Sequence, residues 1–258
     1  MSFANAYADE ARAASYADLE FPGTYHLAFR DLPDLLGPAI PGARALDFGC
    51  GAGRSTRFLN ALGFATEGVD ISEAMLAQAR ARDPQGSYHR VADGDLSLIA
   101  EARYDRILSA FTFDNVRADH KTKLFGHLLR LLKPGGRLLN LVSSEELYRM
   151  EWASFSTSPF PGNAIAQAGS PVFTVMKDVV DARPVEDIFC PESGYIEHYR
   201  EVGFERIGSH RPLGRPEEPF QWINELSVAP WRIDILQRPF ERPPYYMGRL
   251  FGLRFGAC

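Results

Sequence analysis

The sequence predicts an α/β protein with a Rossmann-like, doubly wound and mostly parallel sheet. Three observations support this fold class: short apolar runs alternate with helical segments from about residue 43, four such βα units fit into about 100 residues, and glycine or proline marks most junctions. Right-handed crossovers leave few other arrangements for such a series. We therefore expect helices on both faces of one sheet.

The expected elements of this core follow in chain order. Strands are predicted over residues 43–48, 65–69, 88–92, 104–110 and 137–143, and helices over 54–62, from Ser72 to about 82, and around Leu124 to Leu131. Ser72 can cap its helix because its hydroxyl oxygen accepts from free amides of the first turn. Pro134, Gly135 and Gly136 should break the third helix and precede the fifth strand.

The pattern changes after residue 145 and returns near residue 190. Residues 146–189 are interpreted as an insertion with one added strand over 172–180, whereas a helix over 191–202 and strands over 204–209 and 230–236 resume the core. We expect one domain: a helical cap over 1–42, a core over 43–145 and 190–238, and the insertion on the acceptor side. The tail after Pro239 receives no assignment.

Composition excludes several classes of protein. With 258 residues, 45% hydrophobic and 24% charged, the chain can bury a substantial core, so disordered and fibrous classes are excluded. A net charge of −5 favours neither a nucleic-acid nor a membrane-surface partner. Three distant cysteines without a Cys-x-x-Cys pair suggest a reducing compartment and no metal, and no secretory signal is apparent, so a cytoplasmic location is expected.

A glycine-rich loop is the strongest local signal. Asp47-Phe48-Gly49-Cys50-Gly51-Ala52-Gly53 lies between a predicted strand and a predicted helix. In open α/β sheets ligands bind beyond the carboxyl ends of the strands, and glycines there let a ligand approach the backbone. The third glycine of the dinucleotide fingerprint is missing, because Arg54 stands there. Pyrophosphate binding, and with it a nicotinamide oxidoreductase, is disfavoured.

Two further carboxylates follow the next strands. Asp70, in Gly-Val-Asp-Ile-Ser, ends the second strand and has two oxygens that can accept from both hydroxyls of a ribose. Asp95, in Gly-Asp-Leu, follows the third strand and can accept from an adenine amine while the next backbone amide donates to the ring. The glycine loop and these acids describe an adenosine site that needs no phosphate.

These ordered motifs, with Tyr-Asp-Arg-Ile-Leu-Ser-Ala and Leu-Lys-Pro-Gly-Gly-Arg-Leu-Leu, resemble class I S-adenosylmethionine-dependent methyltransferases over about residues 43–145. The resemblance implies seven strands with the last antiparallel, and S-adenosylmethionine as cofactor. It implies that Asp47 fixes the loop or a water, and that the cofactor contacts are Gly49, Gly51 and Gly53 (methionyl and ribose), Asp70 and Ile71 (ribose), Asp95 and Leu96 (adenine), and Ala110 and Phe111 (methionine ammonium). An Asn-Pro-Pro-Tyr motif, which would suggest amide or nucleobase methylation, is lacking.

Other candidates are weaker, and each has a structural alternative. Tyr25 and Arg30, on a predicted N-terminal helix, could cover the cofactor or bind its carboxylate, although packing or surface roles serve equally. The weak catalytic candidates are His198, His26 and Asp114, where Asp114 could instead cap a loop. The insertion supplies Trp152, Phe155 and Phe160 as an apolar lid or as loop anchors.

The functional hypothesis is methyl transfer from S-adenosylmethionine, by in-line displacement, to an O, N or C nucleophile of a small molecule, in a monomer or homodimer. The alternative is a cofactor-binding but non-methylating protein on the same fold, either a regulatory module or a cyclase, since a fold alone does not decide function. Methyl transfer to any acceptor in a labelled-cofactor screen would distinguish the two.

Overall fold

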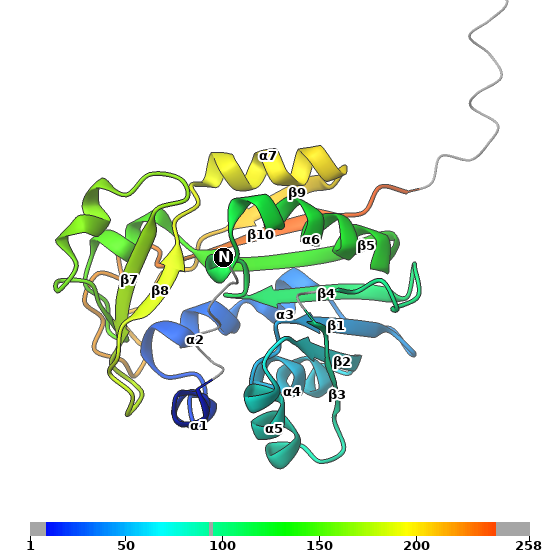
Figure 1. The fold of residues 1–258 in the computed structure, drawn as a ribbon, viewed down its shortest axis with the longest axis horizontal. Helices are drawn as coiled ribbons and strands as arrows, with labels where there is room; N and C mark the ends of the chain where they lie inside the picture. The colour runs from blue at the N-terminus through cyan, green and yellow to red at the C-terminus, as the bar shows by residue number, and fades with distance from the viewer. Residues whose placement is uncertain (1–8, 93–94, 241–258) are drawn as a thin grey trace, which may run out of the picture.

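A seven-stranded sheet lies at the centre of the structure, a computed structural model that describes residues 9–92 and 95–240 (Figure 1). The order is β3-β2-β1-β4-β5-β10-β9, and β10 runs antiparallel to both neighbours while β1 to β5 are parallel. The strands are β1 (Arg44–Phe48), β2 (Ala65–Asp70), β3 (Ser87–Arg90), β4 (Tyr104–Ala110), β5 (Leu132–Ser143), β9 (Glu205–His210) and β10 (Trp231–Gln237). The expected mostly parallel sheet of seven strands is confirmed.

Helices cover both faces of this sheet, as a doubly wound fold requires. Successive residues of a strand point to opposite faces. Accordingly, Leu108 and Leu139 pack on one face with α3 (Leu32–Leu36) and α4 (Arg54–Ala61), whereas Ile107 and Leu138 pack on the other with α6 (Ala118–Leu131) and α7 (Glu192–Val202). The remaining core helix, α5 (Glu73–Arg82), packs beside β3 through Leu76 and Ala79.

The expected helix ends are largely confirmed, with one correction. The Ser72 hydroxyl accepts from the Met75 amide at 3.3 Å, and Gly203 ends α7 with φ of 94°. The helix before Pro134 does end at Leu131, but β5 begins at Leu132, so the Pro-Gly-Gly segment lies within a strand rather than ahead of it. Its backbone pairs with the chain after β10, because Gly135 N donates to Arg238 O and Arg238 N to Gly136 O.

The insertion forms a second, three-stranded antiparallel sheet of β6 (Phe155–Ser156), β7 (Pro171–Met176) and β8 (Val185–Ile188). The single strand expected over 172–180 is therefore wrong in its end and incomplete in number. The strand β8 escaped prediction because it is short and two of its four residues are acids, which are rare in strands. Three short 3₁₀ turns complete this part of the fold: η3 (Phe113–Asn115) follows β4, η4 (Glu145–Arg149) leads into the insertion, and η5 (Pro161–Ile165) lies within it between β6 and β7.

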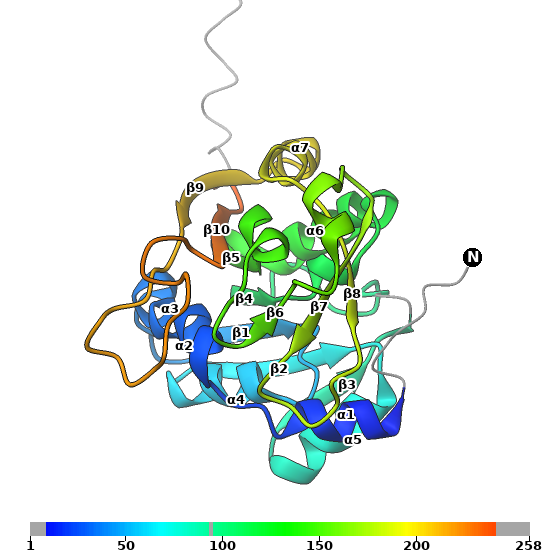
Figure 2. The ribbon, with the colours of Figure 1, turned by 90° about the vertical axis from the view of Figure 1, so that its left-hand side faces the viewer.

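The cap helices and the insertion meet at one end of the central sheet. The cap contains α1 (Glu10–Ala17), α2 (Gly23–Arg30) and α3. Figures 1 and 2 show α1, α2 and the β6–β8 sheet at the end where the parallel strands finish. Ligands of open α/β sheets bind at this end. The structure thus places both added parts over the expected ligand site. The tail beyond residue 240 lies outside the described residues.

A fully buried carboxylate, Glu225, joins the cap, the insertion and the loop before β10. Its Oε1 accepts from Thr24 Oγ1 and from Ala153 N, each at 2.7 Å, and its Oε2 accepts from the amides of Ile223 and Asn224 at 2.8 and 3.1 Å. One side chain therefore satisfies four donors from three segments that are distant in sequence.

Replacing Glu225 by alanine is expected to lower the free energy of unfolding by about 3 kcal/mol or more, because buried donors lose charge-assisted hydrogen bonds. Urea denaturation of the full chain measures this. The control is Glu217→Ala, which removes an exposed acid from the same loop and should change stability by less than about 0.5 kcal/mol. Equal effects of the two substitutions would contradict the linking role of Glu225.

Candidate functional site

The glycine loop borders a cavity beneath the N-terminal cap, called here the glycine-loop cavity. The loop supplies backbone, α1 and α2 supply apolar cover, and the end of β4 closes one side. Its lining residues are Tyr16, Ala17, Leu19, Phe29, Gly49, Cys50, Gly51, Ala52, Arg54, Ser55, Ala110 and Phe111. Gly49, Gly51, Ala110 and Phe111, which the sequence proposes as cofactor contacts, therefore border one space.

Left-handed backbone shapes this loop. Gly49, Gly51 and Gly53 have φ of 76°, 52° and 80°, a region that side chains with a Cβ seldom adopt. A Cβ on Gly53 would lie 2.6 Å from the Tyr88 hydroxyl oxygen, and one on Gly51 would lie 2.9 Å from Met75 Cε. The backbone conformation thus favours glycine at all three positions, and at Gly53 the close approach of the Tyr88 ring favours it further.

Asp47 lies fully buried at the base of the loop. Its Oδ2 accepts from Ser55 Oγ and Thr56 Oγ1, both at 2.7 Å, which ties β1 to the first turn of α4. Its Oδ1 has no hydrogen-bond partner within residues 9–92 and 95–240. Burial raises the pKa of Asp47 to about 6, against the lowering effect of the two hydroxyl donors. This buried, unsatisfied oxygen fits an ordered internal water beside the loop.

Asp70 holds the glycine loop from the end of β2. Its Oδ2 accepts from Gly51 N and its Oδ1 from Ser72 N, both at 2.8 Å. Burial raises the pKa of Asp70, while these backbone donors oppose the shift. Each carboxylate oxygen can accept a second hydrogen bond. Asp70 is therefore able to order the loop and to receive a ribose hydroxyl at the same time.

The residues expected to bind adenine are less enclosed than those of the glycine loop. Asp95 is exposed and its Oδ1 accepts from Ser97 N at 2.9 Å, which lowers its pKa. Leu96 is fully buried and Ile71 packs partly buried against the same core cluster. Gly94, of the predicted Gly-Asp-Leu motif, lies outside the described residues. The adenine contacts of Asp95 and Leu96 stay predictions.

Arg54, the first residue of α4, is a part of the site that the sequence did not reveal. Its guanidinium lies 5.0 Å from the ring centre of Tyr25 and 5.2 Å from that of Phe29, and it donates to Tyr16 Oη at 3.3 Å. Arginine over aromatic faces gains a cation–π attraction. Arg54 therefore fastens the cap to the glycine loop; the only sequence signal was its place in the dinucleotide pattern.

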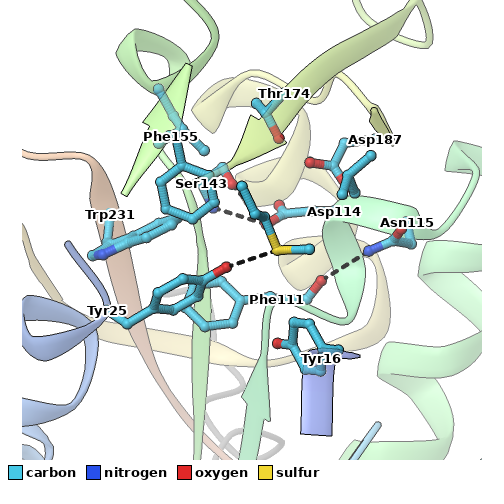
Figure 3. A pocket seen from close by; sticks show the side chains of 13 residues that line it. Tyr16, Tyr25, Phe111, Asp114, Asn115, Ser143, Phe155, Thr174, Asp187 and Trp231 are labelled. Atoms are coloured by element: carbon cyan, nitrogen blue, oxygen red, sulfur yellow. Dashed lines mark hydrogen bonds between the residues drawn. The ribbon is translucent and has the colours of Figure 1, made fainter. Parts of the chain in front are cut away.

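A second cavity, the aromatic cavity, adjoins the first. Figure 3 shows it from close by. It is lined by Tyr16, Tyr25, Phe111, Asp114, Asn115, Ser143, Leu147, Phe155, Thr174, Met176, Val185, Asp187 and Trp231. Phe111 and Tyr16 border both cavities. Phe111 has φ of 63°, a left-handed conformation that is strained for a residue with a Cβ and that clusters at functional sites.

Two buried carboxylates border the aromatic cavity. Asp114 Oδ2 accepts from the amide and the hydroxyl of Ser143 at 3.0 and 2.9 Å, and Tyr148 Oη donates to Asp187 Oδ2 at 3.1 Å. Burial raises the pKa of both, and that of Asp187 reaches about 7 because Asp114 adds like-charge repulsion. Asp114 was a sequence candidate; Asp187 was missed.

The other acid–base candidates lie outside both cavities. His26 contacts Glu218 at 3.3 Å and packs on Phe220, and His198 pairs with Thr122 Oγ1 at 2.8 Å between α6 and α7. Neither lines the glycine-loop cavity or the aromatic cavity. Their side chains are occupied by local partners, so the catalytic roles suggested for them have no support in their positions.

The two candidate residues of the cap, Tyr25 and Arg30, lie in different places. Tyr25 borders the aromatic cavity and its hydroxyl donates to Met176 Sδ at 3.2 Å. Arg30 donates instead to Asp31 at 2.8 Å and to Glu218 at 2.7 Å, outside both cavities. A cofactor contact by Arg30 therefore finds no support in its position.

The three lid candidates of the insertion also lie in different places. Phe155 borders the aromatic cavity, whereas Trp152 is fully buried and its indole N–H donates to Leu147 O at 2.8 Å. Phe160 packs on Phe173, with ring centres 5.6 Å apart. The loop-anchor alternative thus describes Trp152 and Phe160, and Phe155 alone of the three faces the site.

Along the described chain, no helix is long and apolar enough to span a membrane, and no three His, Cys, Asp or Glu side chains group as metal ligands.

A glycine loop after β1, a carboxylate after β2 and this sheet order define the Rossmann-like class of nucleoside-cofactor proteins. The sequence family described as methyltransferase domain matches residues 45–136. The chain is 40% identical over 103 residues to demethylmenaquinone methyltransferase of Tropheryma whipplei (strain Twist), a match covering 38% of this chain and only 41% of that relative.

Two longer matches agree. The chain is 30% identical over 210 residues to the ubiquinone/menaquinone biosynthesis C-methyltransferase UbiE of Stutzerimonas stutzeri (strain A1501), covering 76% of this chain and 78% of the relative. It shares its fold, with a TM-score of 0.56 and 21% identity, with an S-adenosylmethionine-dependent methyltransferase from Mesorhizobium loti, over 81% of this chain and 97% of that one. The chain belongs to the class I S-adenosylmethionine-dependent methyltransferases, and its cofactor is S-adenosylmethionine.

Proposed function

We propose that this protein transfers the methyl group of S-adenosylmethionine to an O, N or C nucleophile of a small molecule held in the aromatic cavity. One observation carries the proposal: the glycine-loop cavity and the aromatic cavity meet at Phe111 and Tyr16. A methyl group at that junction faces any molecule in the second cavity. S-Adenosylmethionine supplies this methyl group and leaves as S-adenosylhomocysteine.

The residues of the chain would act mainly by position. Asp70 and the glycine loop hold the donor, and the rings of Phe111 and Tyr16 face the sulfonium, whose charge an aromatic face attracts. The buried aromatic walls exclude water from the reacting atoms. Holding two reactants in near-attack geometry supplies a large part of a barrier reduction, equivalent to about 7–11 kcal/mol in well-oriented cases.

The relatives support a small acceptor. The UbiE relative is named for C-methylation in ubiquinone and menaquinone biosynthesis. The negative net charge of this chain supports the same choice over a nucleic acid. A cytoplasmic location and a monomeric or homodimeric state are parts of this proposal that sedimentation and cell fractionation would test.

Replacing Asp70 by alanine is expected to weaken S-adenosylmethionine binding about 100-fold, because the ribose loses its acceptor and Gly51 loses the carboxylate that fixes it. Isothermal titration calorimetry with S-adenosylmethionine measures this. The control is Asp119→Ala, an exposed acid at the start of α6, which should bind as the wild type does. Unchanged binding by the Asp70 variant would refute the assigned cofactor site.

Transfer itself requires a second measurement. The full chain is incubated with S-adenosylmethionine carrying a tritiated methyl group and with fractionated small-molecule extracts, and label is sought in the products. Label in a small molecule supports the proposal. Tight cofactor binding without transfer to any fraction would favour the non-methylating alternative.

A further inference from the structure

The aromatic cavity has two unlike sides. Figure 3 shows the rings of Tyr25, Phe155 and Trp231 on one side and the carboxylates of Asp114 and Asp187 on the other. The rings pack together, with centres 4.7 Å apart for Phe111 and Trp231 and 5.1 Å apart for Tyr25 and Phe155. Such walls favour a flat apolar molecule, because aromatic faces stack on other aromatic faces.

The aromatic side offers no free polar group to a ligand. The Trp231 indole N–H donates to Thr24 O at 2.7 Å, and the Tyr25 hydroxyl donates to Met176 Sδ. Hydrogen bonding to a ligand must therefore come from the opposite side of the cavity. This arrangement orients a bound molecule with its polar group away from the rings.

On the polar side of the cavity, both oxygens of Asp114 already accept hydrogen bonds from the protein. Its Oδ2 accepts twice from Ser143, and its Oδ1 lies 3.5 Å from the Tyr195 hydroxyl, which donates to it. Asp187 differs, since Tyr148 donates only to its Oδ2. Neither Asp187 Oδ1 nor the Thr174 hydroxyl forms a hydrogen bond with another described residue. Both residues are more than nine-tenths buried, and both reach into the cavity from β8 and β7 (Figure 3).

The charges around Asp187 determine which kind of ligand group it can bind. Lys121 is fully buried nearby and donates to Phe113 O at 2.7 Å and to Val116 O. Its charge acts favourably on both Asp114 and Asp187. Because a cation of the chain already offsets these carboxylates, the cavity does not call for a cationic ligand. A neutral O–H donor fits better, with Thr174 as its second hydrogen-bond partner.

We propose that the acceptor is a planar aromatic compound whose phenolic hydroxyl is directed at Asp187, and that Asp187 is the general base of the transfer. This inference rests on the function proposed above. The hydroxyl proton passes to Asp187 Oδ1 while an oxygen electron pair forms the new O–CH₃ bond. The S–CH₃ bond breaks with its electron pair left on sulfur, and the proton later passes from Asp187 to solvent.

The protonation chemistry agrees with this geometry. The groups that act on Asp187 are Asp114 and Glu186, which raise its pKa, and Tyr148 and Lys121, which lower it; with burial the pKa is about 7. Such a base is half ionised near neutral pH, where general bases are most effective. A phenol with pKa near 10 lies about three units above it. The pKa of an aliphatic hydroxyl is closer to that of water, about 15.7, and is therefore much further from the pKa of Asp187.

The test compares Asp187→Asn with Glu186→Gln in the full chain. The control changes the neighbouring acid of β8, which is exposed and outside the cavity. The acceptors are a panel of phenols that includes 2-naphthol, with decahydro-2-naphthol as the non-planar matched alcohol, and the donor carries a tritiated methyl group. Calorimetry with S-adenosylmethionine, expected to be unchanged in both variants, reports the cofactor site separately.

We expect phenols to yield methyl ethers, with 2-naphthol turned over at least 100-fold faster than decahydro-2-naphthol. In Asp187→Asn, kcat should fall about 100-fold with KM within threefold, and the rise of kcat to a plateau near pH 7 should move toward the pKa of the phenol. Glu186→Gln should keep the wild-type kcat, and the midpoint of its pH profile should move only slightly downward, because Glu186 is the weaker of the two acids that raise the pKa of Asp187.

Three results would overturn the inference while leaving the proposed function intact: transfer only to non-phenolic compounds, ring-methylated instead of ether products, or an Asp187→Asn variant with wild-type kcat and pH profile. Absence of S-adenosylmethionine binding in the wild type would instead refute the proposed function, and this inference with it.

Discussion

Alanine at position 49 is expected to abolish measurable binding of S-adenosylmethionine and to lower the melting temperature by about 5–10 °C. A Cβ on Gly49 would lie 2.0, 2.5 and 2.8 Å from Oγ1, Cγ2 and Cβ of Thr112. Rotation of Thr112 does not relieve this overlap, because its own Cβ stays in place. The loop cannot shift freely either, since the amides of Gly49 and Cys50 both donate to Val69 O. The cavity that receives the donor must therefore deform.

A matched control separates this overlap from backbone strain. Gly42 has φ of 81°, close to the 76° of Gly49, but a Cβ there would meet nothing within 4 Å. Gly42→Ala should thus carry only the left-handed penalty of about 1–2 kcal/mol and bind S-adenosylmethionine normally. Calorimetric titrations and thermal melts of both variants provide the readouts. Binding by Gly49→Ala within threefold of the wild type would show that the loop has room that the structure denies.

The sequence predicted the sheet and the glycine loop because their signals are local. Apolar runs of strand length, helix caps such as Ser72, and glycines at strand ends each depend on a few neighbouring residues. Asp70 follows from the same logic, since the carboxyl ends of adjacent parallel strands meet at one edge. These features depend little on what packs against them, so they could be located before the structure was known.

The acceptor side could not be predicted in the same way, because its chemistry depends on distant contacts. Arg30 has the charge to bind a carboxylate, but Glu218, far along the chain, holds it elsewhere. Asp187 lies on a four-residue strand whose pairing with β7 is needed to bring it to the cavity. One signal was present: buried Val185 and Asp187 of β8 alternate with exposed or half-buried residues, and buried Phe189 follows the strand in the same pattern. An acid among apolar neighbours in such a pattern suggests a functional group.

The same burial that prepares Asp187 for chemistry should weaken the fold at high pH. Its pKa rises from the ordinary 3.8 to about 7 on folding, so the folded state binds the proton more tightly than the unfolded state. The stability that this group contributes is complete below about pH 4 and is lost as pH rises through the folded pKa near 7. Because Asp114 and Asp187 repel each other when both are ionised, the loss reflects the pair as well as the single side chain.

Asp187→Asn is therefore expected to gain stability relative to the wild type as pH rises. Each pH unit within the window corresponds to about 1.4 kcal/mol, so the difference in unfolding free energy should shift by about 2–3 kcal/mol in favour of the variant between pH 5 and pH 8. Urea denaturation at both pH values measures it, with Glu186→Gln as the exposed control on the same strand, for which a much smaller shift is expected because Glu186 raises the pKa of Asp187 only weakly. A variant that gains stability while losing turnover would show that Asp187 is kept for function at the expense of the fold, whereas a pH-independent difference would mean that Asp187 is already ionised at pH 5 in the folded state.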